Sequence, residues 1–291
     1  MSFSFYIPAP EPPDYQAILD GLDFWDVHCE EGEAEDAPRE GSWPEGSLHF
    51  YRDAVSTRGV EVTYENGRFQ VRILSLSSPE DYELALRFAE SAAVLLKQPI
   101  EPEDDEPFPV EQLRERYTDE WVRDMNDSGA RAVRYLINDG DQTVTSCGPH
   151  RPFHIGPRLL KELDEAGPEE EFPDRLIEKM RQLQNIDADE YYCANTMEAK
   201  RDENDPEEKG FTFAVWGPGV FYLLPDVKYL ALVRGEEEPP VFIPKENLPD
   251  LLLNGWEWAD EKQVLVEAID EDEWAALVER AREYEVSPFE A

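Results

Sequence analysis

The chain has 291 residues and is strongly acidic, with 67 Asp and Glu against 27 Lys and Arg and a formal net charge of −40 at pH 7. Hydrophobic residues make up 41% of the chain and aromatic residues 11%, which is enough to build a core and excludes wholesale disorder. Because a surface of this charge repels phosphates and anionic lipid headgroups, we expect no nucleic-acid and no membrane-surface role.

The N-terminal part contains a clear hairpin signal. Residues 60–64 and 68–73 alternate between apolar and polar types on either side of Asn66-Gly67, the dipeptide that favours a type I′ turn. A strand is also predicted at residues 3–7, and a short helix at 15–22. This part of the chain is therefore expected to form an antiparallel sheet.

An amphipathic helix is predicted directly after the hairpin. Ser78 is a favourable N-cap, proline follows at the first helical position, and acids occupy the first turn. Apolar residues then recur at helical spacing to about Lys97.

Residues 98–109 are expected to separate two subdomains. They contain four prolines and five acids, and proline removes backbone hydrogen bonds while like charges keep a segment extended. The predicted organisation is an N-terminal α+β subdomain at 1–97, a Pro- and acid-rich linker at 98–109 and a C-terminal α+β subdomain at 110–291.

The part of the chain after residue 109 mixes predicted strands and helices without strict alternation. Helices are expected at 110–125, 157–166, 173–183, 245–253 and 270–284, and strands at 132–137, 143–147, 190–194, 210–216, 220–224, 229–233 and 263–269. This pattern predicts the α+β class, with mainly antiparallel sheets and flanking amphipathic helices.

The cysteines and the N-terminus bear on the compartment. The three cysteines, Cys29, Cys147 and Cys193, lie far apart and form no CxxC pair, which disfavours a disulfide framework. The N-terminus has no basic region followed by an apolar stretch, as a signal peptide would have. We therefore expect a cytoplasmic protein that does not cross a membrane.

The hairpin and its helix carry a family resemblance. The segments Tyr64-Glu-Asn-Gly-Arg-Phe-Gln-Val-Arg72 and Ser77-Ser-Pro-Glu-Asp-Tyr-Glu-Leu-Ala-Leu86 resemble an uncharacterised bacterial family of acidic cytosolic α+β proteins, classed as a domain of unknown function. The resemblance covers roughly residues 60–103. It implies an intracellular bacterial protein and brings no site residues with it. Proteins of this kind also resemble immunity proteins, which neutralise a toxin by binding it.

Standard catalytic motifs are absent from the sequence. It contains no P-loop, no GxGxxG opening a helix, no GxSxG, no HExxH and no EF-hand loop. With four histidines, few general-base arrangements are available. Familiar hydrolases, kinases and dehydrogenases are therefore disfavoured.

One segment could bind a metal ion. Cys147, His150 and His154 form a Cys-x2-His-x3-His pattern, which suits zinc by ligand type and local spacing. A tetrahedral site needs a fourth ligand, which Cys193 or an acid would have to supply through folding. The alternative is a loop with a buried cysteine and two surface imidazoles, and no cofactor.

The same segment supports an anion-binding hypothesis. His150, Arg151, His154 and Arg158 form a small basic patch just before a predicted helix, whose N-terminal amides could hold a phosphate or carboxylate. The alternative is that the two arginines pair with nearby acids such as Glu162.

Aromatic residues in the second half are candidate partner contacts. Trp216, Trp256 and Trp258 are of the type that anchors protein interfaces. They are equally suited to a core between antiparallel strands.

The predicted function is non-catalytic protein binding in the cytosol. The acidic surface would dock a basic protein, as an immunity-type factor docks a toxin, with complementary charge accelerating the encounter. If they bind no partner, the runs of acids at 30–36, 101–106, 169–171 and 236–238 are expected to be solvated faces or linkers. The alternatives are a ligand- or metal-binding protein or enzyme that uses residues 147–158, and a self-associating scaffold.

Overall fold

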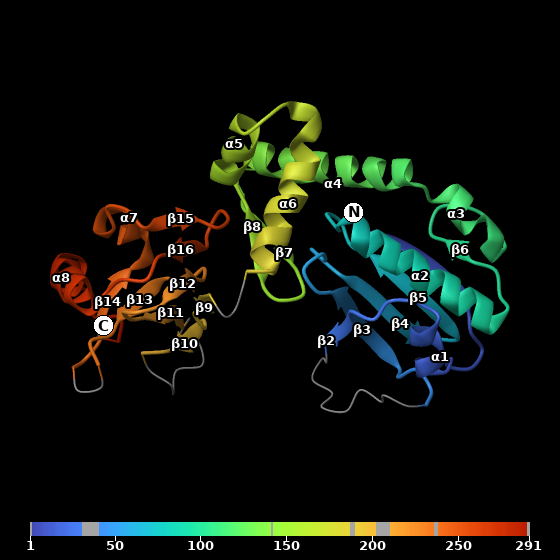
Figure 1. Ribbon diagram of the computed structural model, residues 1–291, viewed down its shortest axis with the longest axis horizontal. Coiled ribbons are helices and arrows are strands. Elements are labelled where there is room, and N and C mark those ends of the chain that lie inside the picture. The colour runs from blue at the N-terminus through green and yellow to red at the C-terminus, as the bar shows by residue number, and fades with distance from the viewer. Residues whose placement is uncertain are drawn as a thin grey trace. The chain divides into compact units, whose positions relative to one another are not determined.

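Helices and mostly antiparallel strands follow one another irregularly along the chain, which confirms the predicted α+β class (Figure 1). The computed structural model describes residues 2–30, 41–140, 142–186, 190–201, 210–235 and 238–289. No helix within these ranges is both long enough and apolar enough to cross a bilayer.

Two compact units divide the chain between Asn185 and Ile186. The segment 98–109, predicted to be a linker, lies within the first unit. Ile100 and Phe108 exchange two backbone hydrogen bonds, of 2.9 and 3.0 Å, and both side chains are buried in the first core. The acids and prolines around them resemble a linker, but these two apolar residues attach the segment to the core.

A six-stranded antiparallel sheet forms one part of the first unit, in the order β2-β3-β4-β5-β1-β6. Its strands are β1 (Phe3–Pro8), β2 (Val27–Glu30), β3 (Gly46–Arg52), β4 (Val60–Glu65), β5 (Arg68–Ile73) and β6 (Glu101–Pro102). The predicted Asn66-Gly67 hairpin joins β4 to β5, and both turn residues have the positive φ that a type I′ turn requires, 53° and 74°. Pro102 is accommodated because β6 is an edge strand.

The helix α2 (Pro79–Leu96) packs on one face of this sheet, and α1 (Tyr15–Asp20) packs on α2 (Figure 1). The predicted cap is present: the Ser78 hydroxyl accepts from Asp81 N, and the Asp81 carboxylate accepts from Ser78 N. Phe5, Val71 and Phe88 are fully buried between the sheet and α2.

The rest of the first unit is helical, apart from a two-stranded hairpin. Its elements are η1 (Val110–Gln112), α3 (Leu113–Arg116), α4 (Asp119–Gly140), β7 (Val144–Cys147), β8 (Pro152–Ile155), α5 (Pro157–Glu165), η2 (Glu169–Glu171) and α6 (Phe172–Gln184). The strand predicted at 132–137 is wrong, because these residues lie in α4. Ala130, Val133 and Ile137 are buried at helical spacing, whereas residues 132–137 taken alone, Ala-Val-Arg-Tyr-Leu-Ile, are a short run of mostly apolar residues that resembles a strand.

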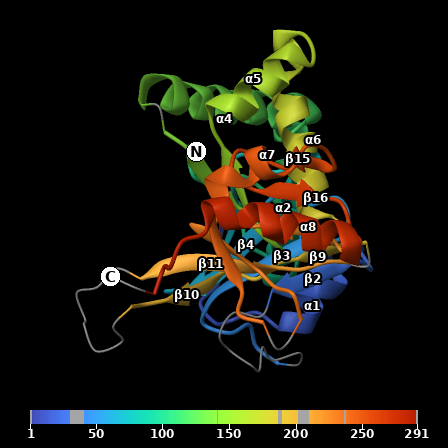
Figure 2. The ribbon, with the colours of Figure 1, turned by 90° about the vertical axis from the view of Figure 1, so that its left-hand side faces the viewer.

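The second unit is built from two four-stranded sheets with the orders β10-β11-β13-β14 and β15-β16-β12-β9. Its strands are β9 (Tyr191–Cys193), β10 (Met197–Ala199), β11 (Phe211–Trp216), β12 (Phe221–Leu224), β13 (Tyr229–Leu232), β14 (Val241–Pro244), β15 (Trp256–Trp258) and β16 (Val264–Val266). The pairs β11–β13 and β9–β12 are parallel. Its helices are η3 (Lys245–Asn247), α7 (Leu248–Leu251), α8 (Glu271–Ala281) and η4 (Arg282–Tyr284) (Figure 2). The helix α8 buries Trp274 and Val278 in the core of this unit.

Candidate functional site

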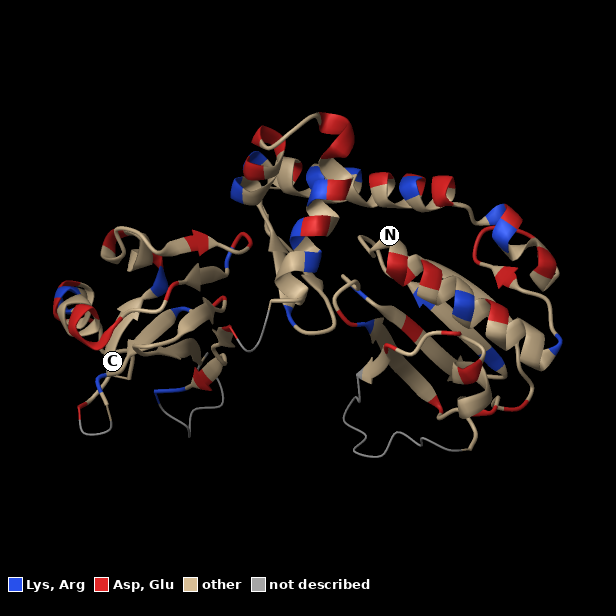
Figure 3. Cartoon of the chain, viewed as in Figure 1, with Lys and Arg blue, Asp and Glu red and all other residues tan. Residues whose placement is uncertain are grey.

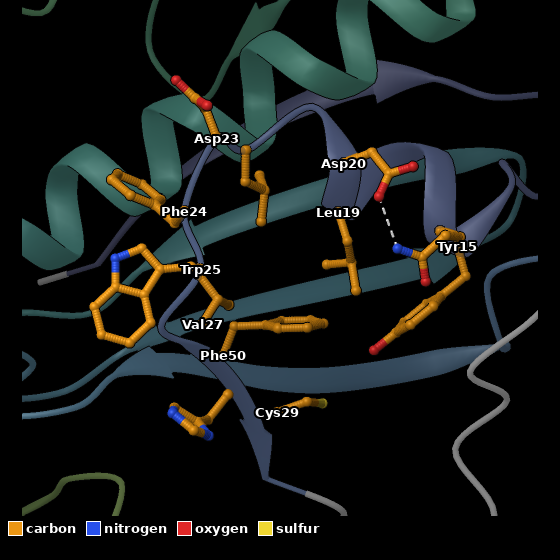
Figure 4. A pocket seen from close by; sticks show the side chains of 12 residues that line it. Tyr15, Leu19, Asp20, Asp23, Phe24, Trp25, Val27, Cys29 and Phe50 are labelled. Atoms are coloured by element: carbon orange, nitrogen blue, oxygen red, sulfur yellow. Dashed lines mark hydrogen bonds between the residues drawn. The ribbon is translucent and has the colours of Figure 1, made fainter.

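A hollow of about 760 Å³ lies beside α1 and the edge strand β2 in the first unit (Figure 4). We call it the α1–β2 hollow. Its apolar lining consists of side chains from α1, from the segment that follows it and from the adjoining strands: Tyr15, Leu19, Leu22, Phe24, Val27 and Phe50. Cys29, partly exposed, also lines it.

Local sequence explains how α1 is placed. Asp14 caps the helix, because its carboxylate accepts from Ala17 N at 2.8 Å. At the other end, Gly21 lies against α2, where a Cβ atom would fall 2.2 Å from Ser91 Oγ. The Ser91 hydroxyl donates to Ile18 O at 2.8 Å. These contacts fix α1 on α2 and so set one wall of the hollow.

The segment between α1 and β2 is held by an ion pair. Arg52, the last residue of β3, places its Nη2 atom 3.0 Å from Asp26 Oδ2, and its guanidinium carbon lies 4.1 Å from the centroid of the Phe24 ring. The hydrogen bond from Arg52 lowers the pKa of Asp26 below its ordinary value of 3.8. The segment is therefore braced on both sides of Trp25.

Trp25 is the most exposed large hydrophobic residue among those the structure describes, with 96% of its surface accessible. Figure 4 shows its indole at the margin of the hollow, whereas Phe50 and Leu19 lie inside it. A fully exposed tryptophan beside an apolar depression is costly in water and is typical of a contact surface.

Carboxylates prevail around the hollow, and its lining residue His28 places Nε2 2.9 Å from the Asp53 carboxylate. Asp20 and Asp23 line it and are exposed, and no Lys or Arg is among its described lining residues. The first 38 residues of the sequence contain ten acids and no Lys or Arg, and Figure 3 shows acids prevailing over bases elsewhere on both units. The predicted acid runs at 30–36 and 236–238 fall mostly on residues outside those described.

Two of the three predicted zinc ligands contact other side chains, and the third is exposed. Cys147 is exposed at the end of β7, the His150 ring packs edge-on against Tyr51 with 5.0 Å between centroids, and the buried His154 has its Nδ1 atom 3.0 Å from Thr145 Oγ1. Within the described ranges, no three His, Cys, Asp or Glu side chains gather as a set that could hold a metal ion.

The predicted anion-binding residues are likewise held by separate contacts. Gln184 on α6 accepts from the backbone N–H groups of His150 and Arg151, and its amide donates to Arg151 O at 2.8 Å. Arg158 lies 3.5 Å from Glu162, the pairing that the alternative interpretation anticipated.

The three predicted partner-contact tryptophans differ in exposure. Trp216 is 1% exposed and packs edge-on against Trp274 with 4.9 Å between centroids, so it stabilises the second core and is not at the surface. Trp256 and Trp258 are partly buried against that core, with rings 5.7 Å apart, and Trp256 Nε1 donates to Leu252 O.

The residues that form the α1–β2 hollow were not singled out from the sequence. Two features of the sequence could have indicated these residues. One is Phe24-Trp25 next to Asp23 and Asp26, and the other is the long N-terminal stretch in which acids have no basic counterpart.

Comparison with known proteins assigns the chain to one family. No curated protein and no solved structure matches the chain. One family model matches residues 2–205, a range that contains the α1–β2 hollow. This confirms the predicted membership of a family of unknown function. The chain belongs to the family DUF4299, described as a domain of unknown function.

Proposed function

We propose that the protein is a non-catalytic binding protein that docks a basic protein partner through the acidic surface around the α1–β2 hollow. An immunity-type factor acts in this way when it neutralises a toxin. The observation that carries the proposal is the exposed Trp25, which adjoins a hollow lined by Asp20 and Asp23 and by no described Lys or Arg.

Electrostatics support a basic partner. The net charge of −40 attracts cations over several ångströms, and such attraction raises the association rate of oppositely charged proteins. Close to the hollow, the Arg52 guanidinium is already bound by Asp26, so it does not neutralise Asp20 and Asp23. A partner with Lys or Arg side chains would gain these two carboxylates as neighbours.

Burial of the Trp25 ring against the partner would slow dissociation of the complex. Tryptophan is over-represented among residues that dominate interface energies, because burying its large ring removes much apolar surface from water. Since Trp25 is 96% exposed in the free protein, nearly all of that surface is available to a partner.

The test is affinity capture from the native lysate with matched variants. Immobilised wild-type protein, a D20N/D23N variant, a W25A variant and a D124N/D139N control are compared by quantitative mass spectrometry at low and high salt. The control removes two exposed acids from α4 in the same unit. We expect a basic protein that high salt releases, and that D20N/D23N and W25A retain at least tenfold less well than the control. Equal capture by all four proteins, or capture insensitive to salt, would contradict the proposal.

A further inference from the structure

We infer that the α1–β2 hollow holds one bulky apolar side chain of the partner, carried on a segment with Lys or Arg on both sides of it. This inference rests on the proposed function and specifies what the partner presents. Its basis is the arrangement of chemistry in the hollow, where an apolar floor is bordered by carboxylates.

Apolar and polar groups both line the hollow. Among the apolar ones, Leu19, Phe24 and Val27 are partly exposed, whereas Phe50 is 1% exposed and contributes almost no accessible surface. A side chain that enters the hollow therefore meets the exposed parts of Leu19, Phe24 and Val27. The volume, about 760 Å³, lies within the range of roughly 300–1,000 Å³ typical of ligand pockets. It accommodates a phenylalanine- or leucine-sized side chain together with some of the backbone that carries it.

Two carboxylates at the margin of the hollow favour basic residues on either side of that apolar side chain. Asp20 lies at the end of α1, and its carboxylate is fixed by a 2.8 Å hydrogen bond from the Gln16 amide. Asp23 follows the helix with a positive φ of 58°, an uncommon conformation for a residue other than glycine. Both carboxylates repel an anionic ligand and attract cations placed beside the apolar group.

The position of Trp25 favours a polypeptide over a small molecule. The indole stands at the margin of the hollow and is exposed over almost its whole surface (Figure 4). A small molecule within the hollow would leave much of this ring in water, whereas a chain that continues beyond the margin covers it. A protein segment thus accounts for the floor, the carboxylates and the tryptophan together.

The hollow is also organised before binding. The Arg52–Asp26 pair and the stacking of Arg52 on Phe24 hold the segment on one side, and the Ser91–Ile18 hydrogen bond holds α1 on the other. Binding to a preformed site loses less conformational entropy than binding that must order a loop.

Fluorescence anisotropy with synthetic peptides tests the inference on the full chain. The probe is a fluorescein-labelled peptide with one phenylalanine between two pairs of lysines. Two further peptides carry serine in place of the phenylalanine, or glutamates in place of the lysines. Two variants fill the hollow: Q16W from the exposed surface of α1, and C29F from β2. Q182W, which changes an exposed glutamine on α6, is the matched control.

We expect the wild type and Q182W to bind the phenylalanine peptide about tenfold or more tightly than the serine peptide, and the glutamate peptide not at all. In Q16W and C29F the preference for phenylalanine should disappear while binding of the lysines persists. Q16W replaces an exposed side chain, so it keeps the test valid if C29F fails to fold, and Q16A, which removes the hydrogen bond to Asp20 without filling the hollow, controls for the loss of that bond.

The outcomes separate this inference from the proposed function. If the wild type binds the phenylalanine and serine peptides equally, and D20N/D23N weakens its binding of both, the inference about an apolar side chain in the hollow is wrong. The proposal of a basic partner then still stands. A phenylalanine preference that survives in both Q16W and C29F would also overturn the inference, because the side chain would then bind elsewhere. If the lysine peptides bind no better than the glutamate peptide, and D20N/D23N changes nothing, both ideas fail.

Discussion

Arg52 and Asp26 form a two-point ion pair in which Arg52 Nε lies 3.1 Å from both carboxylate oxygens of Asp26. The side chains are only 20% and 15% exposed, so solvent screens the pair less than it screens a surface ion pair. The pair joins the last residue of β3 to the segment that presents Trp25. A contact between the sheet and the segment before β2 thus helps to shape a candidate binding surface.

Replacing Arg52 with alanine should destabilise the first unit and loosen this segment. The substitution leaves the Asp26 carboxylate partly buried without its partner, for which we expect a loss of about 1–3 kcal/mol in the free energy of unfolding. The measurement is urea unfolding followed by circular dichroism. The control is R72A, which breaks the more exposed Arg72–Glu61 pair and should cost less than about 1 kcal/mol. Equal losses for the two variants would show that the Arg52–Asp26 pair does not brace the segment.

Acidification should remove the contribution of the same pair. The pKa of Asp26 in the folded protein is lowered, first by the hydrogen bond from Arg52, below its ordinary value of 3.8. The stability that the pair supplies is therefore fully present above pH 3.8 and is lost as the pH falls through the lower, folded pKa. We expect the difference in unfolding free energy between wild type and D26N to shrink steadily below about pH 4. A difference that stays constant from pH 5 down to the acid transition would contradict this.

Asp81 should be among the most sensitive polar positions in the chain. Its Oδ2 atom accepts from the backbone N–H groups of Ser78, Thr57 and Arg58, at 3.0–3.1 Å, and the side chain is fully buried. D81A leaves three backbone donors, two of them in fully buried hydrogen bonds, without this acceptor, so we expect a loss of about 3 kcal/mol or more in the free energy of unfolding. S78A removes one cap acceptor and should cost about 1 kcal/mol. If urea unfolding shows that S78A loses more unfolding free energy than D81A, the role assigned to the Asp81 carboxylate is wrong.

The elements that the sequence predicted well are those whose signals are local. The Asn66-Gly67 turn and the Ser78 cap depend on residues within four positions of one another, so neighbouring side chains settle the backbone conformation without help from the rest of the fold. The α4 segment differs. Val133 and Ile137 are buried on one side of the helix, but the short apolar run that contains them does not distinguish a strand from a helix.

Long-range contacts also explain why the site was not predicted. Residues 147–158 contain histidine, cysteine and arginine, whose chemistry predicts a metal or anion site. In the fold, however, Tyr51, Thr145 and Gln184 contact residues of this segment. The α1–β2 hollow exists because β3 supplies Phe50 and Arg52 to a segment some 25 residues earlier. No pattern within that segment reveals this pairing.

Lys245 should make the stability of the second unit depend on alkaline pH. Its side chain is 9% exposed, and Nζ donates to the carbonyl oxygens of Pro225 and Lys262. Burial lowers the pKa of Lys245 from 10.5 to about 8, although Asp226 and Asp260 partly oppose the shift. The unfolded chain therefore binds more protons than the folded one between pH 8 and 10.5, and the contribution of Lys245 to stability rises with pH across this window.

We expect the difference in unfolding free energy between wild type and K245M to change by about 2 kcal/mol in favour of the wild type from pH 8 to pH 10, because one pH unit within the window corresponds to about 1.4 kcal/mol. The measurement is urea unfolding followed by circular dichroism at half-unit steps of pH. Comparison with K228M, which removes an exposed lysine in the same unit, controls for the general effect of deleting one positive charge. If K245M and K228M show the same pH dependence, the Lys245 amine titrates as an ordinary surface lysine and its burial does not govern its charge.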